Sequence, residues 1–311
     1  MWLDQETNPG RPNDAAALRG LTGLADQALK DCDYDLALSI LDTAALQCLE
    51  AGHDKDLRQL VVAAIEAMPA RSASPQTLAA LALADPDGQS AMIIREVPRL
   101  GQRAEHDTAD ADDSLAAGVA ATIAGDPETG AAFLASAITQ LRVQGRLRLL
   151  ARALVVQALG ATCRSDWNVA IPAAEEGIRL ARETEQPVFV TIGVCSQLML
   201  AALRGDGDAA TSRALRSDGQ QALGHAGYGL AAVQAALGLS ALGVGHYEAA
   251  YEHPAANLHA RPESRGVREV ISLRPAGPAR AAGTTAVPGW LVRPRRANGR
   301  RNLGGRRRPP R

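Results

Sequence analysis

Four aspartates near the start of the chain have the spacing of a calcium-binding loop. Asp31, Asp33 and Asp35 alternate as the first ligands of an EF-hand loop do, and Asp42 follows at the twelfth position. The sixth position holds Leu36, although an EF-hand loop needs glycine there for its turn. The segment also leads directly into a helical pattern, so the sequence favours a solvent-exposed turn between two helices over a calcium site.

Other residue patterns that could support catalysis are incomplete. A phosphate-binding loop needs Gly-Lys-Ser/Thr, but neither of the two lysines, Lys30 and Lys55, follows a glycine. No Gly-x-Ser-x-Gly sequence marks a nucleophile. His246 and His253 lie seven residues apart, whereas two metal ligands on one helix are three or four residues apart. We therefore predict a protein that is not an enzyme, with no catalytic, cofactor-binding or metal-binding residues.

The remaining reactive side chains fit structural roles. The acidic run 105–113 lies between two expected helices and is typical of an exposed loop. Trp167 and Tyr247 occupy equivalent positions in the repeat described below, which favours packing between repeats over a ligand cage. The cysteines are far apart and form no CxxC pair, which favours buried core thiols; they are Cys32, Cys48, Cys163 and Cys195.

An internal repeat of forty residues runs through the second half of the chain. Its turn-like segments begin at Gly125, Ser165, Gly205 and Gly245, and a small residue stands five positions after each: Gly130, Ala170, Ala210 and Ala250. Small residues in register let paired helices approach closely. Between the turns, apolar residues recur at helical spacing, and the chain is 46% hydrophobic but only 3% aromatic. The sequence predicts an all-α, tetratricopeptide-like α-solenoid of antiparallel helix pairs with a period of about 40 residues.

The expected helix pairs cover most of the chain before residue 253. They are 13–31 with 34–50, 55–68 with 75–84, 88–104 with 112–124, 127–143 with 146–163, 167–184 with 187–203, and 207–224 with 227–243, and a further helix begins near 246. Asp126 followed by Pro127 is a favourable helix start, because aspartate caps the helix and proline fits its first position. Pro172 predicts either a kink or a later start of its helix.

The near-zero net charge of −1 conceals two regions of opposite charge. Residues 254–311 contain fourteen arginines and two glutamates, a net charge of about +12, so the first 253 residues have about −13. The basic region also contains eight prolines and seven glycines. We expect a disordered segment at 1–12, a tetratricopeptide-like domain at 13–253 and a disordered Arg/Pro/Gly-rich tail at 254–311.

The sequence also indicates where the protein acts and what it could bind. The N-terminal segment is acidic, unlike a signal peptide, and the apolar run 187–203 is too short and too polar for a membrane span. We expect a cytoplasmic protein with no membrane contact. A protein, a peptide or a small inducer is the expected partner on the concave surface of the repeats. Nucleic acid would bind only non-specifically, through the basic tail.

Parts of the chain resemble a known family of regulators. The segments GRLRLLARALVVQALGATCRSDWNVAIPAAEEGIRLARETEQP (145–187), LMLAALRGDGDAA and LAAVQAALGLSALGVGHYEAAYEH are similar to the large LuxR-family transcriptional regulators of actinobacteria. The resemblance extends from about Ala15 to His253 and is best from Ala116 onward. Members of that family have an N-terminal ATPase domain, a long tetratricopeptide-like region and a C-terminal helix-turn-helix. The resemblance implies the signal-sensing and interaction region alone.

The resemblance ends at His253, where the charge of the chain also changes. The family commonly continues EHLRRMFDPADPAYHEK, where this chain has EHPAANLHARPESRGVREV. Codons for Pro254, Ala255 and Ala256 read one base later permit Leu-Arg-Arg, so our hypothesis is that residues 254–311 are a frameshifted tail. The chain would then be a partial LuxR-family regulator without the ATPase and helix-turn-helix parts. The alternative is a standalone helical-repeat adaptor whose basic tail binds nucleic acid or an acidic partner.

Overall fold

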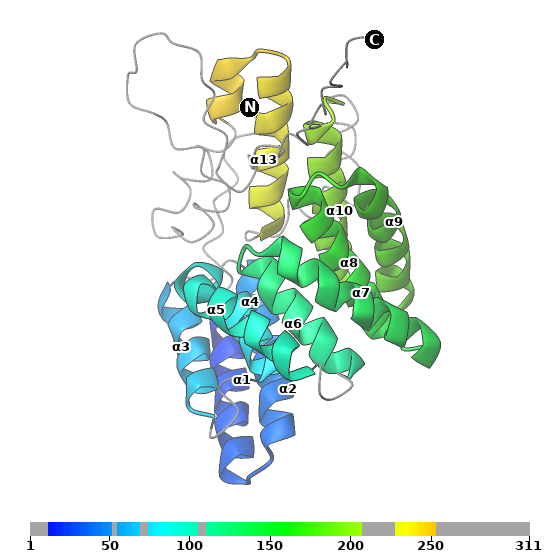
Figure 1. The fold of residues 1–311 in the computed structure, drawn as a ribbon. Coiled ribbons are helices and arrows are strands. Elements are labelled where there is room, and N and C mark those ends of the chain that lie inside the picture. The colour runs from blue at the N-terminus through cyan, green and yellow to red at the C-terminus, as the bar shows by residue number, and fades with distance from the viewer. Residues whose placement is uncertain (1–11, 52–54, 69–73, 105–109, 207–227, 253–311) are drawn as a thin grey trace, which may run out of the picture.

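A computed structural model describes residues 12–51, 55–68, 74–104, 110–206 and 228–252 of the chain. These residues are almost entirely helical and contain no β-strand (Figure 1). The helices are α1 (Pro12–Lys30), α2 (Tyr34–Ala51), α3 (Lys55–Glu66), α4 (Pro75–Ala84), α5 (Pro86–Ala104), α6 (Ala111–Ile123), α7 (Pro127–Gln144), α8 (Leu147–Cys163), α9 (Trp167–Glu183), α10 (Pro187–Leu203) and α13 (Tyr228–Gly243). Residues 247–252 begin a further helix. The all-α prediction is confirmed for these residues, whereas the predicted helix 207–224, the segment 1–12 (apart from residue 12) and the tail 254–311 lie outside them.

One type of turn connects helices at intervals of twenty residues in the second half of the chain. In each turn one residue has a left-handed backbone, its N–H donates to the carbonyl three residues earlier, and the next N–H donates to the carbonyl five residues before itself. These residues are Gly125, Gly145, Ser165, Glu185, Gly205 and Gly245, and Cys32 occupies the same place between α1 and α2. The forty-residue period of the sequence therefore consists of two structurally similar halves.

Helix starts follow the capping residues of the sequence. Asp126 accepts a hydrogen bond from the Thr129 N–H and Pro127 occupies the first turn of α7, as predicted. The later start that Pro172 suggested for α9 is wrong, because α9 begins at Trp167 and contains Pro172 in its interior. Helix α10 coincides with the apolar run 187–203 and is largely buried within the protein, so this run forms a core helix.

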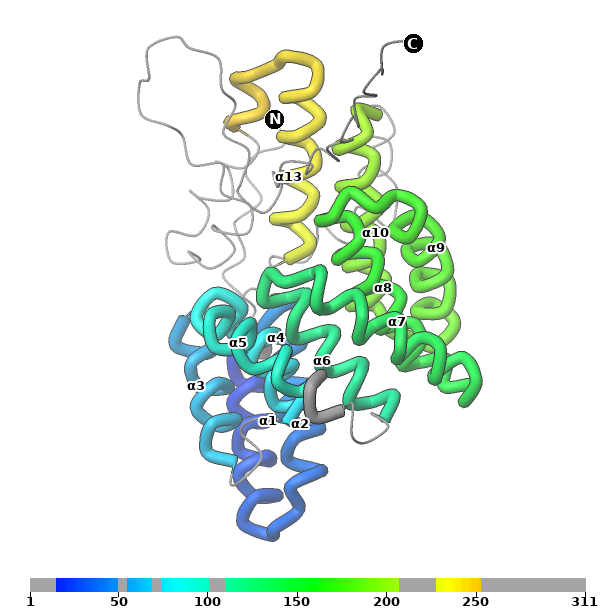
Figure 2. Tube along the Cα trace, viewed as in Figure 1, coloured from blue at the N-terminus to red at the C-terminus, as the bar shows by residue number. Residues whose placement is uncertain are grey.

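The helices pack in neighbouring pairs, and the second helices of successive pairs also pack on one another. Helix α4 lies between α2 and α6, and α8 packs against α6 and α10 (Figure 1). The first helices α5 and α7 have no comparable contacts with each other. The row of second helices curves so far that α13 reaches α2, although their sequences are almost 180 residues apart (Figure 2).

Glycines allow the closest approaches between helices. A methyl group on Gly118 of α6 would lie 2.6 Å from Leu134 Cγ and 3.1 Å from the Leu134 backbone nitrogen on α7. Gly130 and Ala170, the small residues that follow their turns by five positions, are buried as the repeat predicted. Ala250 is also buried. The core therefore depends on small residues at helix crossings as well as on leucine and valine.

Candidate functional site

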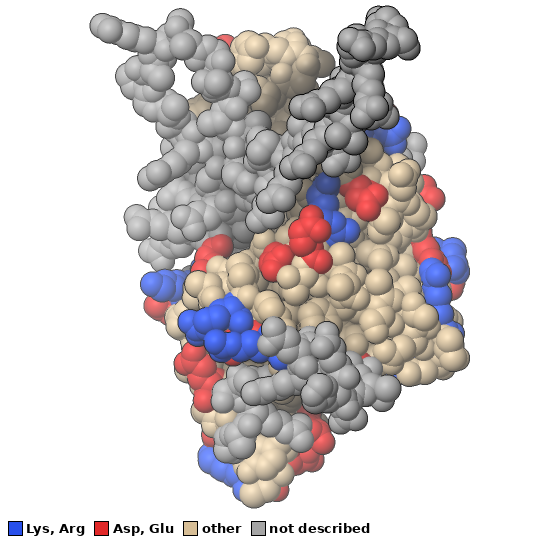
Figure 3. Space-filling view, in the orientation of Figure 1, with Lys and Arg blue, Asp and Glu red and all other residues tan. Residues whose placement is uncertain are grey.

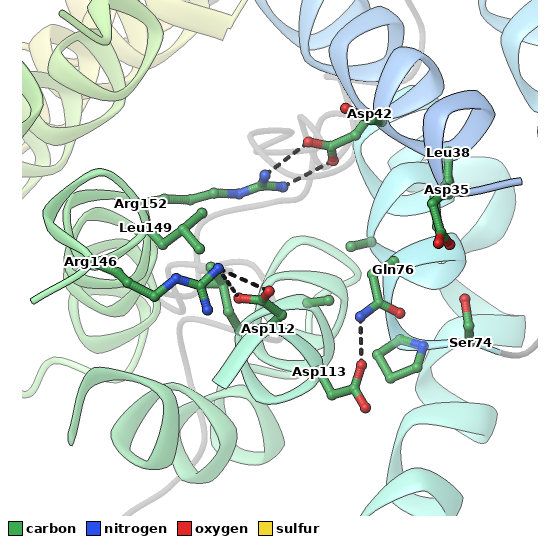
Figure 4. A pocket seen from close by; sticks show the side chains of 15 residues that line it. Asp35, Leu38, Asp42, Ser74, Gln76, Asp112, Asp113, Arg146, Leu149 and Arg152 are labelled. Carbon is green, nitrogen blue, oxygen red and sulfur yellow. Dashed lines mark hydrogen bonds and ion pairs between the residues drawn. The ribbon is translucent and has the colours of Figure 1, made fainter. Parts of the chain in front are cut away.

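An open groove of about 830 Å³ lies between the second helices of four successive pairs (Figure 4). We refer to it as the groove. Its lining comes from α2, α4, α6 and α8 and comprises Asp35, Leu38, Ser39, Asp42, Ser74, Pro75, Gln76, Ala79, Asp112, Asp113, Leu115, Ala116, Arg146, Leu149 and Arg152. The four helices are brought together by the packing of each second helix on the next, and the groove lies between them.

Arg152 connects opposite sides of the groove. Its guanidinium donates two hydrogen bonds to Asp42, at 2.9 and 3.1 Å, and the two residues are 110 positions apart in the chain. The Arg152 side chain is only 14% exposed, and its guanidinium carbon lies 5.6 Å from the centre of the Phe189 ring of α10. This ion pair, most of which is buried, links α2 to α8 across the groove (Figure 4).

Two further polar contacts line the groove, both involving aspartates of α6. Arg146 at the start of α8 forms an ion pair with Asp112 of α6 at 2.9 Å, and Gln76 of α4 donates to Asp113 of α6. The hydrogen bond to Asp112 raises the pKa of the Arg146 guanidinium, which therefore stays charged.

The lining has four aspartates and two arginines, so the groove has an excess of negative charge. On the face in Figure 3, by contrast, the described acidic and basic side chains form small mixed groups with a wide uncharged area between them. That face presents no continuous basic surface for a phosphate backbone among the described residues. The charge of the groove favours a ligand that is at least partly cationic.

Two of the four aspartates with calcium-loop spacing belong to a helix connection, as predicted. Asp31 and Asp33 lie in the turn between α1 and α2, and Asp33 accepts a hydrogen bond from the Leu36 N–H at the start of α2. Asp35 and Asp42 lie on α2 and line the groove. Among the described residues, no cluster of three or more histidine, cysteine or acidic side chains could hold a metal ion.

The acidic run 105–113 contains groove residues that the sequence did not reveal. The expectation of an exposed loop is wrong for Asp112 and Asp113, which are half-buried on α6, while residues 105–109 lie outside the described parts. Asp110 caps α6 through the Ala111 N–H. The sequence does contain a signal for this ion pair. Asp112 and Arg146 have opposite charges and lie 34 residues apart, and the same is true of the ion-paired Arg142 and Glu176. Two residues of opposite charge that lie nearly one repeat apart therefore indicate an ion pair between adjacent helix pairs.

The cysteine prediction is correct for the buried thiols and wrong for Cys32. Cys48 and Cys195 are buried and Cys163 is partly buried, whereas Cys32 is exposed. Cys32 is the left-handed residue of its turn, so its side chain lies beyond the end of α1 and outside the core. Burial raises the pKa of Cys48 and Cys195 to about 12 and that of Cys163 to about 11.

These environments predict that one thiol in four reacts in the folded protein. At pH 8 the three buried thiols stay protonated because their pKa values lie well above the solution pH, and only a thiolate is nucleophilic. A thiol-reactive chromophore should therefore modify Cys32 alone, and Cys32→Ser should remove the fast phase. All four thiols should react in denaturant. Fast modification of two or more thiols in the folded protein would contradict the described packing.

The remaining predicted positions do not form a site. His246 lies exposed in the turn before the helix 247–252, and His253 lies outside the described residues. Trp167 packs against a cluster of Ala161, Ala170 and Leu200, which confirms its structural role, but Tyr247 is exposed and the packing expected for it is wrong.

Comparisons with known proteins add no assignment. No family model matches the chain, and neither a curated protein nor a solved structure is significantly similar to it. None of the described helices has both the length and the apolar character that crossing a membrane requires.

Proposed function

We propose that this chain is a tetratricopeptide-like α-solenoid that acts as a binding module, with the groove as its ligand site. The observation that carries this proposal is the groove itself, which four successive second helices line with polar side chains. The forty-residue recurrence of the left-handed turn at Gly125, Ser165, Gly205 and Gly245 supports the solenoid assignment. Binding, without catalysis, would be the function of such a surface.

The ligand that fits this groove best is a peptide or protein segment with basic side chains, or a cationic small inducer. Its four aspartates exceed its two arginines, and both arginines are engaged by aspartates. A cationic group can therefore approach Asp35 and Asp113 without breaking either ion pair. An anionic ligand would have to compete with Asp42 or Asp112 for its arginine.

Peptide binding with charge-neutralised variants tests the groove. An array of 15-residue peptides with zero to four arginines would be screened against the protein by fluorescence anisotropy. We expect the arginine-rich members to bind, and the variant Asp35→Asn/Asp113→Asn to bind them about tenfold more weakly, since about 1.4 kcal/mol corresponds to a factor of ten. Glu175→Gln is the matched control, because Glu175 is exposed on α9 outside the groove. Equal loss in both variants would mean non-specific charge attraction, and no binding by any peptide would remove the basic-peptide assignment.

We also propose that the module corresponds to the helical-repeat region of a large LuxR-family regulator acting in the cytoplasm. The support is the resemblance of residues 15–253, above all SDWNVAIPAAEEGIRLA at 165–181. Ligand binding in such a regulator would bias the ATPase and DNA-binding parts toward one state. Nucleotide sequence beyond codon 253 tests this relation. A reading frame one base over that encodes further helical repeats and a helix-turn-helix supports it, and its absence contradicts it.

The second candidate is an adaptor whose residues 254–311 bind nucleic acid or an acidic partner. The net charge of about −13 on the first 253 residues and of about +12 on residues 254–311 favours this function. Salt-sensitive binding to a random DNA duplex that disappears when residues 254–311 are deleted would support the adaptor over the regulator.

A further inference from the structure

The groove gathers more negative charge than its own cations neutralise. Four aspartates and two arginines line it, and both arginines are engaged by aspartates, which leaves an excess of two negative charges. Asp113 receives its hydrogen bond from Gln76, a neutral side chain, so this contact leaves the charge of the carboxylate in place. A hollow lined by an excess of one charge concentrates its electric field and attracts groups of the opposite charge.

Several acidic side chains outside the groove are instead paired with cations on the surface. These ion pairs are Asp26 with Lys30, Glu96 with Arg99, Glu176 with Arg142, and Glu183 with Arg179. A basic segment that met one of these carboxylates would have to displace a lysine or an arginine. The groove offers carboxylates beyond those that its own arginines engage, so it is the better acidic partner of the two.

The groove also shows how it holds a guanidinium group. Arg152 donates two hydrogen bonds to Asp42, at 2.9 and 3.1 Å, which is the forked geometry in which arginine recognises a carboxylate. The single ammonium group of lysine has no such fork. An arginine from outside the groove would pair in the same way with Asp35 or Asp113. The matching ligand is therefore a segment rich in arginine.

The chain itself contains such a segment. Residues 293–311 have nine arginines and no acidic residue, whereas residues 254–292 have five arginines and two glutamates. Both stretches lie outside the described part of the chain. Of the two, residues 293–311 have the higher density of the side chain that the groove fits, and no carboxylate that the groove would repel.

The length of the chain allows this segment to reach the groove of its own molecule. Helix α13 packs on α2, which lines the groove, and the described chain ends at residue 252, shortly after α13. The forty residues 253–292 follow, and at about 3.3 Å per residue they can span up to about 130 Å. A folded body of about 250 residues has a radius of gyration of only about 18 Å, so the groove is within reach.

We propose that residues 293–311 occupy the groove of their own molecule, as an internal ligand that competes with external ones. The inference rests on the proposed function of the groove and adds a means of regulating that site. A tethered segment has an effective concentration on the order of 1 mM, so with a Kd of about 100 µM it would fill the groove in about ten molecules for each unfilled one. External peptides would then bind about tenfold more weakly than without this competitor.

Neutralising arginines in the full chain tests this competition. The test variant carries Arg300→Gln, Arg301→Gln, Arg306→Gln, Arg307→Gln and Arg308→Gln. The matched control loses the same charge outside the segment, through Arg261→Gln, Arg265→Gln, Arg268→Gln, Arg274→Gln and Arg280→Gln. We expect a labelled 15-residue peptide with four arginines to bind the test variant about tenfold more tightly than the unsubstituted chain. The control should bind it as the unsubstituted chain does.

The possible outcomes separate this inference from the function of the groove. If the peptide binds the unsubstituted chain and both variants equally, the segment does not occupy the groove, while the groove remains a peptide site. If both variants bind more tightly to the same extent, the effect is one of total charge and the inference is overturned. If no form of the protein binds the peptide, the proposed function fails and the inference fails with it.

A DNA duplex of random sequence tests the same competition from the other side. Asp35→Asn/Asp113→Asn should release the segment and raise the affinity of the full chain for the duplex about tenfold, because coupling between two binding events is reciprocal. The matched control is Glu128→Gln/Glu175→Gln, which removes the same charge from exposed positions outside the groove. Tight duplex binding that Asp35→Asn/Asp113→Asn leaves unchanged would assign the segment to nucleic acid and overturn the inference.

Disulfide trapping locates the segment directly. Ser39 is exposed on α2 and lines the groove, whereas Val143 of α7 is 86% exposed and lies outside it. On a Cys32→Ser background, oxidation should join Ser39→Cys to Gly304→Cys within one chain, and should not join Val143→Cys to Gly304→Cys. The proposal is overturned if no link forms within the chain from Ser39→Cys. Equal linkage from both positions, or linkage only between chains, overturns it as well.

Discussion

Gly118→Ala is expected to lower the free energy of unfolding by about 1–2 kcal/mol. The new methyl group would lie 2.6 Å from Leu134 Cγ and 3.1 Å from the Leu134 backbone nitrogen. These atoms belong to the backbone and the branch point of a buried leucine, so α6 and α7 must separate. Overpacking a core costs about 1–3 kcal/mol, and removing a glycine from a helix returns up to about 1 kcal/mol.

Gly23→Ala provides the matched control for this prediction. Gly23 is also inside a helix, but nothing lies within 4 Å of the position that its methyl group would take. Here only the gain in helix propensity remains, and we expect stabilisation by about 0.5–1 kcal/mol. Urea unfolding followed by circular dichroism measures both variants. The same change in stability at the two positions would show that α6 and α7 do not approach as closely as described.

Arg152→Ala is expected to lower the free energy of unfolding by about 1–3 kcal/mol. The substitution removes two hydrogen bonds to Asp42 and the stacking on Phe189, and leaves Asp42 without its cation. The arginine is 14% exposed and the aspartate 30% exposed, so the pair is weaker than a fully buried one and stronger than a surface one. Because this pair spans α2 and α8, its loss should also widen the groove.

Arg179→Ala is the control for the loss of an arginine. Arg179 pairs with Glu183 at 2.8 Å on the surface of α9, with both side chains more than half exposed, and this pair should contribute no more than about 0.5 kcal/mol. Hydrogen exchange should be faster in α2 and α8 of Arg152→Ala and unchanged in Arg179→Ala. A double-mutant cycle with Asp42→Ala isolates the pair, and a coupling energy near zero would refute its role as a link across the groove.

Local interactions determined the helices, and the sequence was sufficient to predict them. Apolar spacing, the Asp126–Pro127 start and the recurring turn at Gly125, Ser165 and Gly245 predicted boundaries that agree with the structure to within a few residues. Each of these signals acts within one helix and its two ends, over no more than about twenty residues. The later start that Pro172 suggested is wrong, because α9 accommodates a proline in its second turn.

The groove could not be predicted from the sequence, because its residues come from four helices that lie far apart in the chain. Asp42 and Arg152 are 110 residues apart, and their meeting depends on the packing angles of α2, α4, α6 and α8. Each of these contacts joins residues on different helices, as does the close approach of Gly118 on α6 to Leu134 on α7, and the side-chain pattern within one helix does not encode it. The sequence therefore predicted that Asp112 and Asp113 belong to an acidic loop, whereas the structure has them on α6, where they line the groove.

The sequence by itself determined the helices, their order and the repeat that pairs them, since these follow from side-chain periodicity and capping. Only the tertiary structure decided which polar residues share one groove and which of the described apolar residues are exposed. Trp167 and Tyr247 occupy equivalent sequence positions, but Trp167 packs against the cluster of Ala161, Ala170 and Leu200, whereas Tyr247 is 72% exposed. Exposure depends on the neighbour that a residue meets in space, and that neighbour lies a full helix away in the chain.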